Sequence, residues 1–216
     1  MLSSRVVGQS EAVQELCRAV RVSRSGLRDP KRPRGVFLFA GASGVGKTEL
    51  ARALADALFP EGCALLKLDM SELADRFTGS RLLGAPPGYQ GHGEEGQLTG
   101  PLRRRPYSVV LLDEFEKAHP EVQAMFLSLF DEGIVTDAEG RTVVAREAFF
   151  VLTTNAGSDG EARGRLGFGA DTADARREAA LDAARRQFRP ELLNRLDGIV
   201  AFRDLSPSDL ERILAL

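Results

Sequence analysis

The chain has 216 residues, of which 43% are hydrophobic and 28% charged, and its formal net charge at pH 7 is -2. This composition is typical of an ordinary folded domain, and the near balance of charges argues against nucleic acid or an anionic membrane as the main partner. Cys17 and Cys63 lie far apart, without Cys or His at metal-ligand spacing, which argues against a disulfide framework or a zinc site. We find no signal-peptide pattern and no apolar run near the ~20 residues that span a bilayer, so we expect a cytoplasmic protein.

Short apolar segments alternate with helical patterns along the chain, as in a parallel sheet covered on both faces by helices. Helices are predicted from Ser10 to Ser25 and from Lys47 to Leu58. Between the strands we expect a Gly/Pro-rich insertion (84–100), a hairpin (134–144) and a polar loop (157–174). The predicted strands are Val36 to Ala40, Ala64 to Leu68, Ser108 to Leu112, Phe149 to Thr153 and Ile199 to Phe202. The sequence therefore predicts an α/β fold with one five-stranded parallel sheet.

A phosphate-binding motif follows the first predicted strand and opens the helix that begins at Lys47. It reads Gly41, Ala42, Ser43, Gly44, Val45, Gly46, Lys47 and Thr48, a complete GxxxxGKT. The N–H groups of such a loop and the positive end of the helix dipole bind phosphates, so Lys47 would reach the β and γ phosphates of ATP. The Thr48 hydroxyl would bind Mg²⁺. The alternative is a Gly-rich turn that binds nothing.

Two carboxylates end the apolar strand Val109 to Leu112. At the carboxyl edge of an open α/β sheet, Asp113 and Glu114 would face the ligand crevice. Asp113 is placed to hold Mg²⁺, directly or through water, and Glu114 to polarise the water that attacks the γ-phosphate. The pair therefore predicts hydrolysis as well as binding, and the alternative is a solvated acidic strand end.

At this point the chain resembles the AAA+ superfamily, and within it the second ATPase ring of the Clp/heat-shock-100 unfoldases. The matching segments, in chain order, are Arg5 to Gln9, Ser23 to Pro33, Ser80 to Gly91, Arg103 to Lys117, Leu152 to Gly157 and Phe188 to Asp197. The resemblance implies a P-loop NTPase (AAA+) three-layer sandwich with a five-stranded parallel sheet. It also implies a large nucleotide-binding subdomain over residues 1–205. Residues 206–216 then start a helical lid, and we expect the chain to be a truncated piece that lacks the rest of the lid and its sensor-2 arginine.

The resemblance also assigns roles to single residues. The backbone near Val7 would contact adenine, and Asn155 matches sensor 1, which orients the attacking water or touches the γ-phosphate; the alternative is an Asn that ends a strand. Arg195 matches an arginine finger that acts on the neighbouring subunit's ATP, and Arg189 on the same segment is a weaker match. For either arginine, an ordinary surface salt bridge is the alternative.

Two further matches concern partners. Tyr89 lies in a stretch that resembles the substrate-gripping pore loop, although Gln90 replaces an apolar residue of the family pattern; a Tyr packed on its own subunit is the alternative. Leu166, Gly167 and Phe168 fit the tripeptide by which some Clp unfoldases dock on a Clp peptidase. Equally, the side chains of Leu166 and Phe168 could fold back onto the sheet.

The resemblance implies a protein-remodelling ATPase whose hexameric ring threads polypeptide through a central pore. Two other functions stay open. A nucleotide-switched scaffold with little turnover is opposed by the intact Glu114 and Arg195. A DNA-directed motor is opposed by the absence of an evident basic face.

Overall fold

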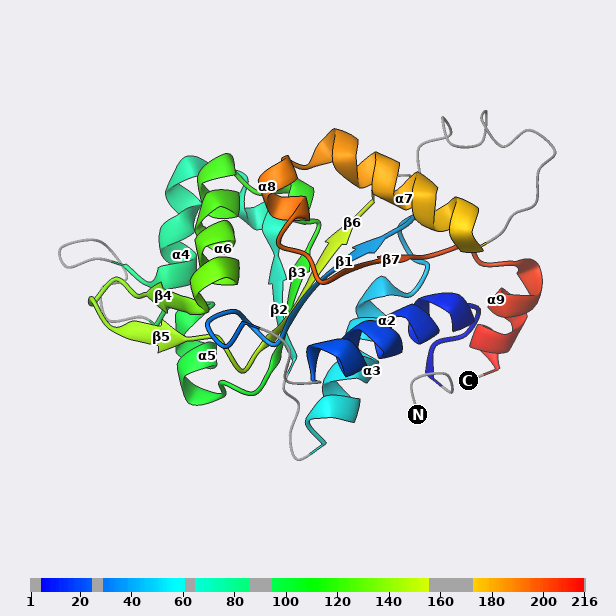
Figure 1. Ribbon diagram of the computed structural model, residues 1–216, viewed down its shortest axis with the longest axis horizontal. Coiled ribbons are helices and arrows are strands. Elements are labelled where there is room, and N and C mark those ends of the chain that lie inside the picture. Colours follow the sequence, from blue (N-terminus) through cyan, green and yellow to red (C-terminus); the bar gives the residue numbers. More distant parts are fainter. Residues whose placement is uncertain (1–4, 25–28, 61–64, 86–94, 156–172, 216) are drawn as a thin grey trace.

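The computed structural model describes residues 5–24, 29–60, 65–85, 95–155 and 173–215 (Figure 1). Within these ranges, no helix is both long and apolar enough to cross a membrane. The main feature is a five-stranded sheet with the strand order β2-β3-β6-β1-β7, and every neighbouring pair in it is parallel. Its strands are β1 (Gly35–Ala40), β2 (Leu65–Asp69), β3 (Val109–Asp113), β6 (Phe149–Thr154) and β7 (Gly198–Ala201). The five-stranded parallel α/β fold predicted from the sequence is confirmed.

Helices cover both faces of this sheet (Figure 1). On one face lie α2 (Ser10–Ser23) and α3 (Lys47–Leu58). The other face is covered by α4 (Gly79–Leu83), α5 (Thr99–Arg104), α6 (Pro120–Glu132), α7 (Ala173–Gln187) and α8 (Pro190–Leu193). The described chain also contains three 3-10 turns, η1 (Met70–Leu73), η2 (Arg76–Thr78) and η3 (Phe115–Lys117), and a last helix, α9 (Pro207–Leu214). The result is a three-layer sandwich.

Alternation along the strands divides the core into two clusters. Phe37, Val109 and Phe149 point toward α2 and α3, whereas Val36, Val110 and Phe150 belong to the cluster that contains α6 and α7. Successive side chains of a strand point to opposite faces, so strands that are buried on both faces read as continuous apolar runs. All six residues of β1 are buried, as are all six of β6.

The predicted boundaries differ from the structure by one or two residues at several ends. The predicted helix from Ser10 ends at Ser23 rather than Ser25, and α3 has the predicted bounds. The hairpin is confirmed as β4 (Ile134–Thr136) and β5 (Thr142–Val144), which pair antiparallel. Within the predicted irregular insertion, however, a helix already begins at Thr99, where the Leu98 N–H and Thr99 hydroxyl bond to α4 carbonyls.

Buried polar side chains tie the amino-terminal segment and α9 to the phosphate-loop region. The Gln9 amide, 2% exposed, donates to the carbonyls of Val45 (3.0 Å) and Arg203 (2.9 Å) and accepts from the Arg203 N–H. Asp209 forms a capping box with Ser206 at the start of α9. Hydrogen bonds from the Ser206 hydroxyl and N–H, together with the Arg203 guanidinium, lower the pKa of Asp209 to about 2 against the opposing effect of burial.

Candidate functional site

The carboxyl ends of neighbouring strands meet at one edge of the sheet and form a cleft there. Register pairs Ala40 with Thr154 and Leu112 with Leu152, so β1, β3 and β6 end within about one residue of the same level. The cleft has a volume of about 350 Å³. Its lining residues are Ser43, Gly44, Gly46, Lys47, Thr48, Glu49, Asp69, Asp113, Glu114 and Asn155. Parallel α/β sheets bind ligands at such an edge.

The backbone between β1 and α3 depends on glycine, as Gly46 and Gly41 show. Gly46, which precedes α3, has φ 106°, a conformation that disfavours residues with a Cβ. At Gly41 a Cβ would lie 2.8 Å from the Cβ of Phe202, so the loop could not approach the end of β7 as closely with any larger residue. The loop therefore turns sharply from the strand and places Lys47 at the start of a helix, under the cleft.

Lys47 carries a positive charge into this region, since its exposed fraction is 8%. Its Nζ, which has three hydrogens to donate, lies within hydrogen-bond distance of four acceptors: the carbonyls of Gly41, Ala42 (3.0 Å) and Thr154 (3.1 Å) and Oδ1 of Asn155 (2.8 Å). Burial lowers the pKa of the Lys47 ammonium, whereas the nearby negative charge of Glu116, and after it those of Asp113 and Glu114, act in the opposite direction.

Thr153 of the neighbouring strand holds the carboxylate of Asp113 and the backbone of Glu114. The Thr153 hydroxyl donates to Oδ1 of Asp113 (2.6 Å) and accepts the N–H of Glu114 (2.9 Å). The other Asp113 oxygen pairs with Lys67 at 2.7 Å. Glu114 has φ 56° and is the one non-glycine residue with positive φ in the described part of the chain. Such a conformation costs of order 1–3 kcal/mol and is typical of functional sites.

Asn155 joins the phosphate loop to these carboxylates. Its Oδ1 accepts from Lys47, its Nδ2 donates to Oε1 of Glu114 (2.9 Å), and its N–H donates to Oε1 of Glu116 (3.1 Å). Oε2 of Glu114 pairs with the ammonium of Lys117 at 2.6 Å. Oε2 of Glu116 is buried and has no hydrogen-bond partner. A continuous polar chain therefore runs from Lys47 through Asn155 and Glu114 to Lys117.

The structure does not bring every predicted residue to the cleft. Arg195 lies elsewhere and pairs with Asp131, with Nε–Oδ2 and Nη2–Oδ2 distances of 2.7 and 2.6 Å. Arg189 is exposed at the start of α8. Val7 is half-buried and does not line the cleft, although its neighbour Val6 packs in the core cluster that includes Val45. Three predicted loop residues, Gly41, Ala42 and Val45, also do not line the cleft, but the carbonyls of Gly41 and Ala42 bind Lys47.

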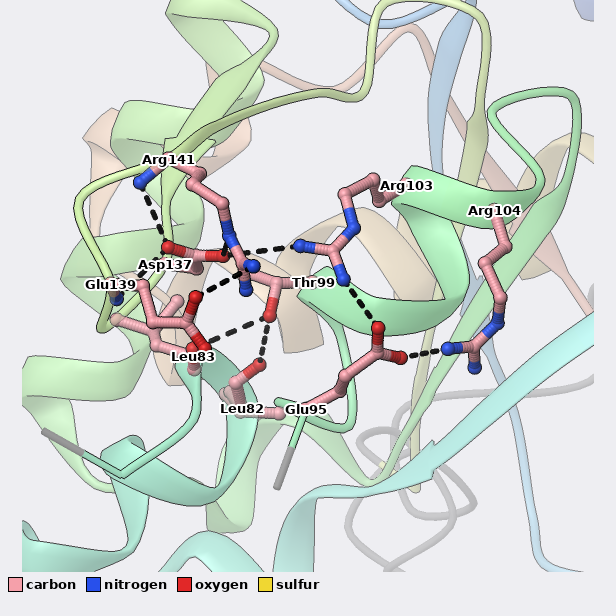
Figure 2. A network of polar contacts seen from close by, with 9 residues as sticks. All are labelled: Leu82, Leu83, Glu95, Thr99, Arg103, Arg104, Asp137, Glu139 and Arg141. Atoms are coloured by element: carbon pink, nitrogen blue, oxygen red, sulfur yellow. Dashed lines mark hydrogen bonds and ion pairs between the residues drawn. The ribbon is translucent and has the colours of Figure 1, made fainter. Parts of the chain in front are cut away.

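Tyr89 and the tripeptide from Leu166 to Phe168 lie outside the described residues. Described residues that precede and follow 86–94 in the sequence belong to a polar network, shown in Figure 2. Glu95 bridges to Gly84 through the backbone and pairs with Arg103 and Arg104 of α5. Arg103 also lies 3.6 Å from Asp137 of the hairpin, whose side chain is 4% exposed and binds Arg141. The network fastens the hairpin, α5 and the end of α4 together.

Several residues that the structure places in or beside the cleft have no role predicted from the sequence. They are Lys67, Asp69, Glu116, Lys117 and Thr153. Glu116 and Lys117 belong to the segment quoted for its family resemblance, and two consecutive threonines precede Asn155 at the end of an apolar strand. These threonines were the signal in the sequence that could have identified Thr153. Hydroxyls at the carboxyl end of a buried strand lie where parallel sheets bind ligands, so they indicate a polar role there.

Comparison with known proteins matches residues 32–199 to the AAA domain (Cdc48 subfamily) model. The chain is 48% identical over 215 residues to the ATP-dependent Clp protease ATP-binding subunit ClpE of Bacillus subtilis, with all of this chain and 31% of that relative covered. It is 50% identical over 216 residues to chaperone protein ClpB of Propionibacterium freudenreichii, with 99% of this chain and 24% of the relative covered. It is 47% identical over 220 residues to the ATP-dependent Clp protease ATP-binding subunit ClpC of Staphylococcus saprophyticus, with all of this chain and 27% of that relative covered. The chain thus spans less than a third of the length of these relatives.

The double role of Thr153 can be tested by removing its hydroxyl. Thr153→Val leaves the part-buried Glu114 N–H without its acceptor and Oδ1 of Asp113 without its donor, so we expect the free energy of unfolding to fall by about 1–3 kcal/mol. Thr153→Ser keeps the hydroxyl and is the matched control. Urea denaturation of the three proteins measures the difference. A valine variant as stable as the wild type would show that the hydroxyl does not hold these two residues.

Proposed function

The chain belongs to the AAA domain family (Cdc48 subfamily), and from this membership we propose that its cleft binds ATP with Mg²⁺ and hydrolyses the γ-phosphate. The observation that carries the proposal is the meeting of Lys47, Thr48, Asp113, Glu114 and Asn155 around one cleft. Each of these residue types has a distinct use in phosphoryl transfer, and their supply by three separate segments of the chain makes a chance arrangement a poor explanation. Binding of a nucleotide is common to the family, and ATP as the nucleotide is our proposal.

Phosphate binding would use charges that already face the cleft. Lys47 is buried among carbonyl oxygens and the Asn155 amide, and a phosphate group offers the same ammonium stronger, anionic acceptors. Gly44 and Gly46 carry no side chains, and a Cβ built on Gly44 would meet nothing within 4 Å, so phosphate oxygens could approach the loop N–H groups and the start of α3. These features support binding of the β and γ phosphates here.

The residues present also fit Mg²⁺. The Thr48 hydroxyl and Asp113 carboxylate are hard oxygen donors that line the same cleft, and Mg²⁺ is commonly bound by one or two such groups together with water and substrate phosphates. Among the described residues, no group of three or more His, Cys, Asp or Glu is placed to hold a metal ion. When bound, the ion would neutralise charge on the phosphates.

Hydrolysis would rest on Glu114 and Asn155. The Glu114 carboxylate lines the cleft, where it can accept a proton from an attacking water, and Asn155 holds that carboxylate through Nδ2. Asn155 also contacts Lys47, so a single side-chain amide would hold both the base, Glu114, and the phosphate-binding cation in place. This arrangement favours ATP hydrolysis as the function, rather than that of a scaffold that changes conformation with nucleotide but does not hydrolyse it.

Two substitutions separate binding from hydrolysis. Lys47→Ala removes the cation that faces the phosphates, and we expect it to abolish ATP binding measured by calorimetry. Glu114→Gln keeps the shape of the side chain but not its ability to take a proton, so we expect normal Mg-ATP affinity and a loss of phosphate release of at least the 10²-fold that general bases supply. Unchanged affinity in the alanine variant would contradict the site. Loss of binding in the glutamine variant would contradict the role of Glu114, and unchanged turnover would favour a different base.

For the full-length protein we propose a hexameric ring in which Arg195 reaches the ATP of the neighbouring subunit. Arg195 lies away from its own cleft and its side chain is 27% exposed, with Asp131 as its partner. An arginine supplied in trans can contribute ~10³ to 10⁵ in rate. Residues 1–205 would form the nucleotide-binding subdomain and residues 206–216 the start of the helical lid.

Subunit mixing tests the trans role of Arg195. In the full-length protein, Arg195→Ala and Glu114→Gln subunits should each be inactive alone, because each lacks one half of every composite site. Mixed rings contain interfaces where an intact Glu114 meets an intact Arg195, so ATP hydrolysis should partly return. Recovery of one variant through an affinity tag carried only by the other establishes that the subunits co-assemble, and the absence of ATP hydrolysis in such mixed rings would contradict the assignment.

The full-length protein would use this cycle to remodel polypeptides, with Tyr89 as the gripping residue. The relatives support this in two ways: one is named a chaperone, and two are named ATP-binding subunits of a Clp protease. Docking of a Clp peptidase through Leu166, Gly167 and Phe168 stays a prediction, as does the cytoplasmic location. A DNA-directed motor would instead require salt-dependent DNA binding.

A further inference from the structure

The carboxylate of Glu114 is held from two sides. On one side Nδ2 of Asn155 donates to Oε1, and on the other the Lys117 ammonium lies 2.6 Å from Oε2. Both carboxylate oxygens therefore have a partner, and they differ in kind: a neutral amide inside the cleft and a cation at its rim. Lys117 does not line the cleft, and its side chain is 51% exposed.

The turn that carries Lys117 is itself fixed. After Glu114 the chain forms η3, in which the Lys117 N–H donates to the carbonyl of Glu114 (2.9 Å). Phe115 is fully buried in this turn, and its ring packs against Phe126 and Phe188, with centroids 5.8 and 6.2 Å away. The aromatic side chain fastens the turn to the core, so the lysine three residues after Glu114 begins from a defined backbone position.

Electrostatics favour the same placement. The pKa of Lys117 is raised, first by its hydrogen bond to Glu114 and then by the charges of Glu114, Glu116 and Asp69. An exposed ion pair of this kind contributes little to stability because water screens it. Its consequence lies in geometry, since a charge-assisted hydrogen bond restricts which rotamers the carboxylate can adopt.

We propose that Lys117 is a positioning residue for the hydrolysis assigned to Glu114: its ammonium holds the carboxylate against Asn155 and so aims it into the cleft. The inference rests on the proposed function for its catalytic meaning, but the positioning can be measured separately. Without the cation, Glu114 would keep one fixed oxygen and gain freedom to turn toward solvent. The same Asn155 amide accepts from Lys47 through Oδ1. If Glu114 moved away, Nδ2 of this amide would lose its hydrogen bond to Glu114, and the amide would be held less firmly beside the phosphate-binding cation.

The ¹⁵N NMR signals of Asn155 in the 216-residue chain test the positioning directly. Its side-chain amide reports on Glu114, and its backbone N–H reports on Glu116. In Lys117→Met we expect the side-chain signal to move toward that of a solvent-exposed amide while the backbone signal stays. Lys117→Arg keeps a cation with hydrogen-bond donors and should restore the wild-type side-chain signal. Glu116→Gln is the matched control and should move the backbone signal instead.

ATP turnover of the same variants tests the consequence. We expect Lys117→Met to lower kcat about tenfold with KM unchanged, within the ~10²-fold that a misplaced group can cost, and Lys117→Arg to recover most of it. An unmoved Asn155 side-chain signal in Lys117→Met, or a wild-type kcat, would overturn the proposal. A wild-type chain that binds no ATP would contradict the proposed function instead, and the NMR result would still decide whether Lys117 positions the carboxylate.

Discussion

Lys47 carries a charge into the protein interior, and burying a charge is costly unless oxygen atoms replace the water that it loses. The oxygen atoms that replace water around Lys47 come from two segments. One is the phosphate loop, which supplies carbonyls, and the other is the end of β6 and the residue after it, which supply the carbonyl of Thr154 and the side-chain amide of Asn155. These contacts require that the ends of β1 and β6 lie side by side, which their parallel register provides. The sheet topology is therefore the condition under which this lysine can be buried and still charged.

The other polar residues of the site are connected to Lys47 through hydrogen bonds. Asn155 connects Lys47 to Glu114, and Thr153, two residues earlier on β6, binds the carboxylate of Asp113 and the backbone N–H of Glu114. The backbone of Glu114 sits in a conformation that few non-glycine residues adopt, and the Thr153 hydroxyl and the buried ring of Phe115 hold it there. Strain at such a position is stable only when the surroundings over-determine it.

The sequence was sufficient for the parts of this arrangement that depend on local pattern. Apolar runs predict the strands within about a residue, and the GxxxxGKT motif predicts the loop and the start of α3 at Lys47. It was insufficient for contacts between distant segments: Thr153 reaches residues 39 and 40 positions away, and Arg195 meets Asp131 across 64. The helix that starts at Thr99 was missed because its backbone bonds to α4, a tertiary contact that overrides the local Gly/Pro signal. The roles of Tyr89 and of the tripeptide from Leu166 to Phe168 stay predictions.

The central claim is that one cleft, organised around Lys47, binds Mg-ATP. Titrating Mg-ATP into the ¹⁵N-labelled chain and following every amide signal tests it without requiring turnover or assembly. The account predicts saturable shifts that are largest in residues 41–48, at Asp113 and Glu114 and at both amides of Asn155. Shifts centred on another part of the chain, or none at millimolar nucleotide, would contradict it.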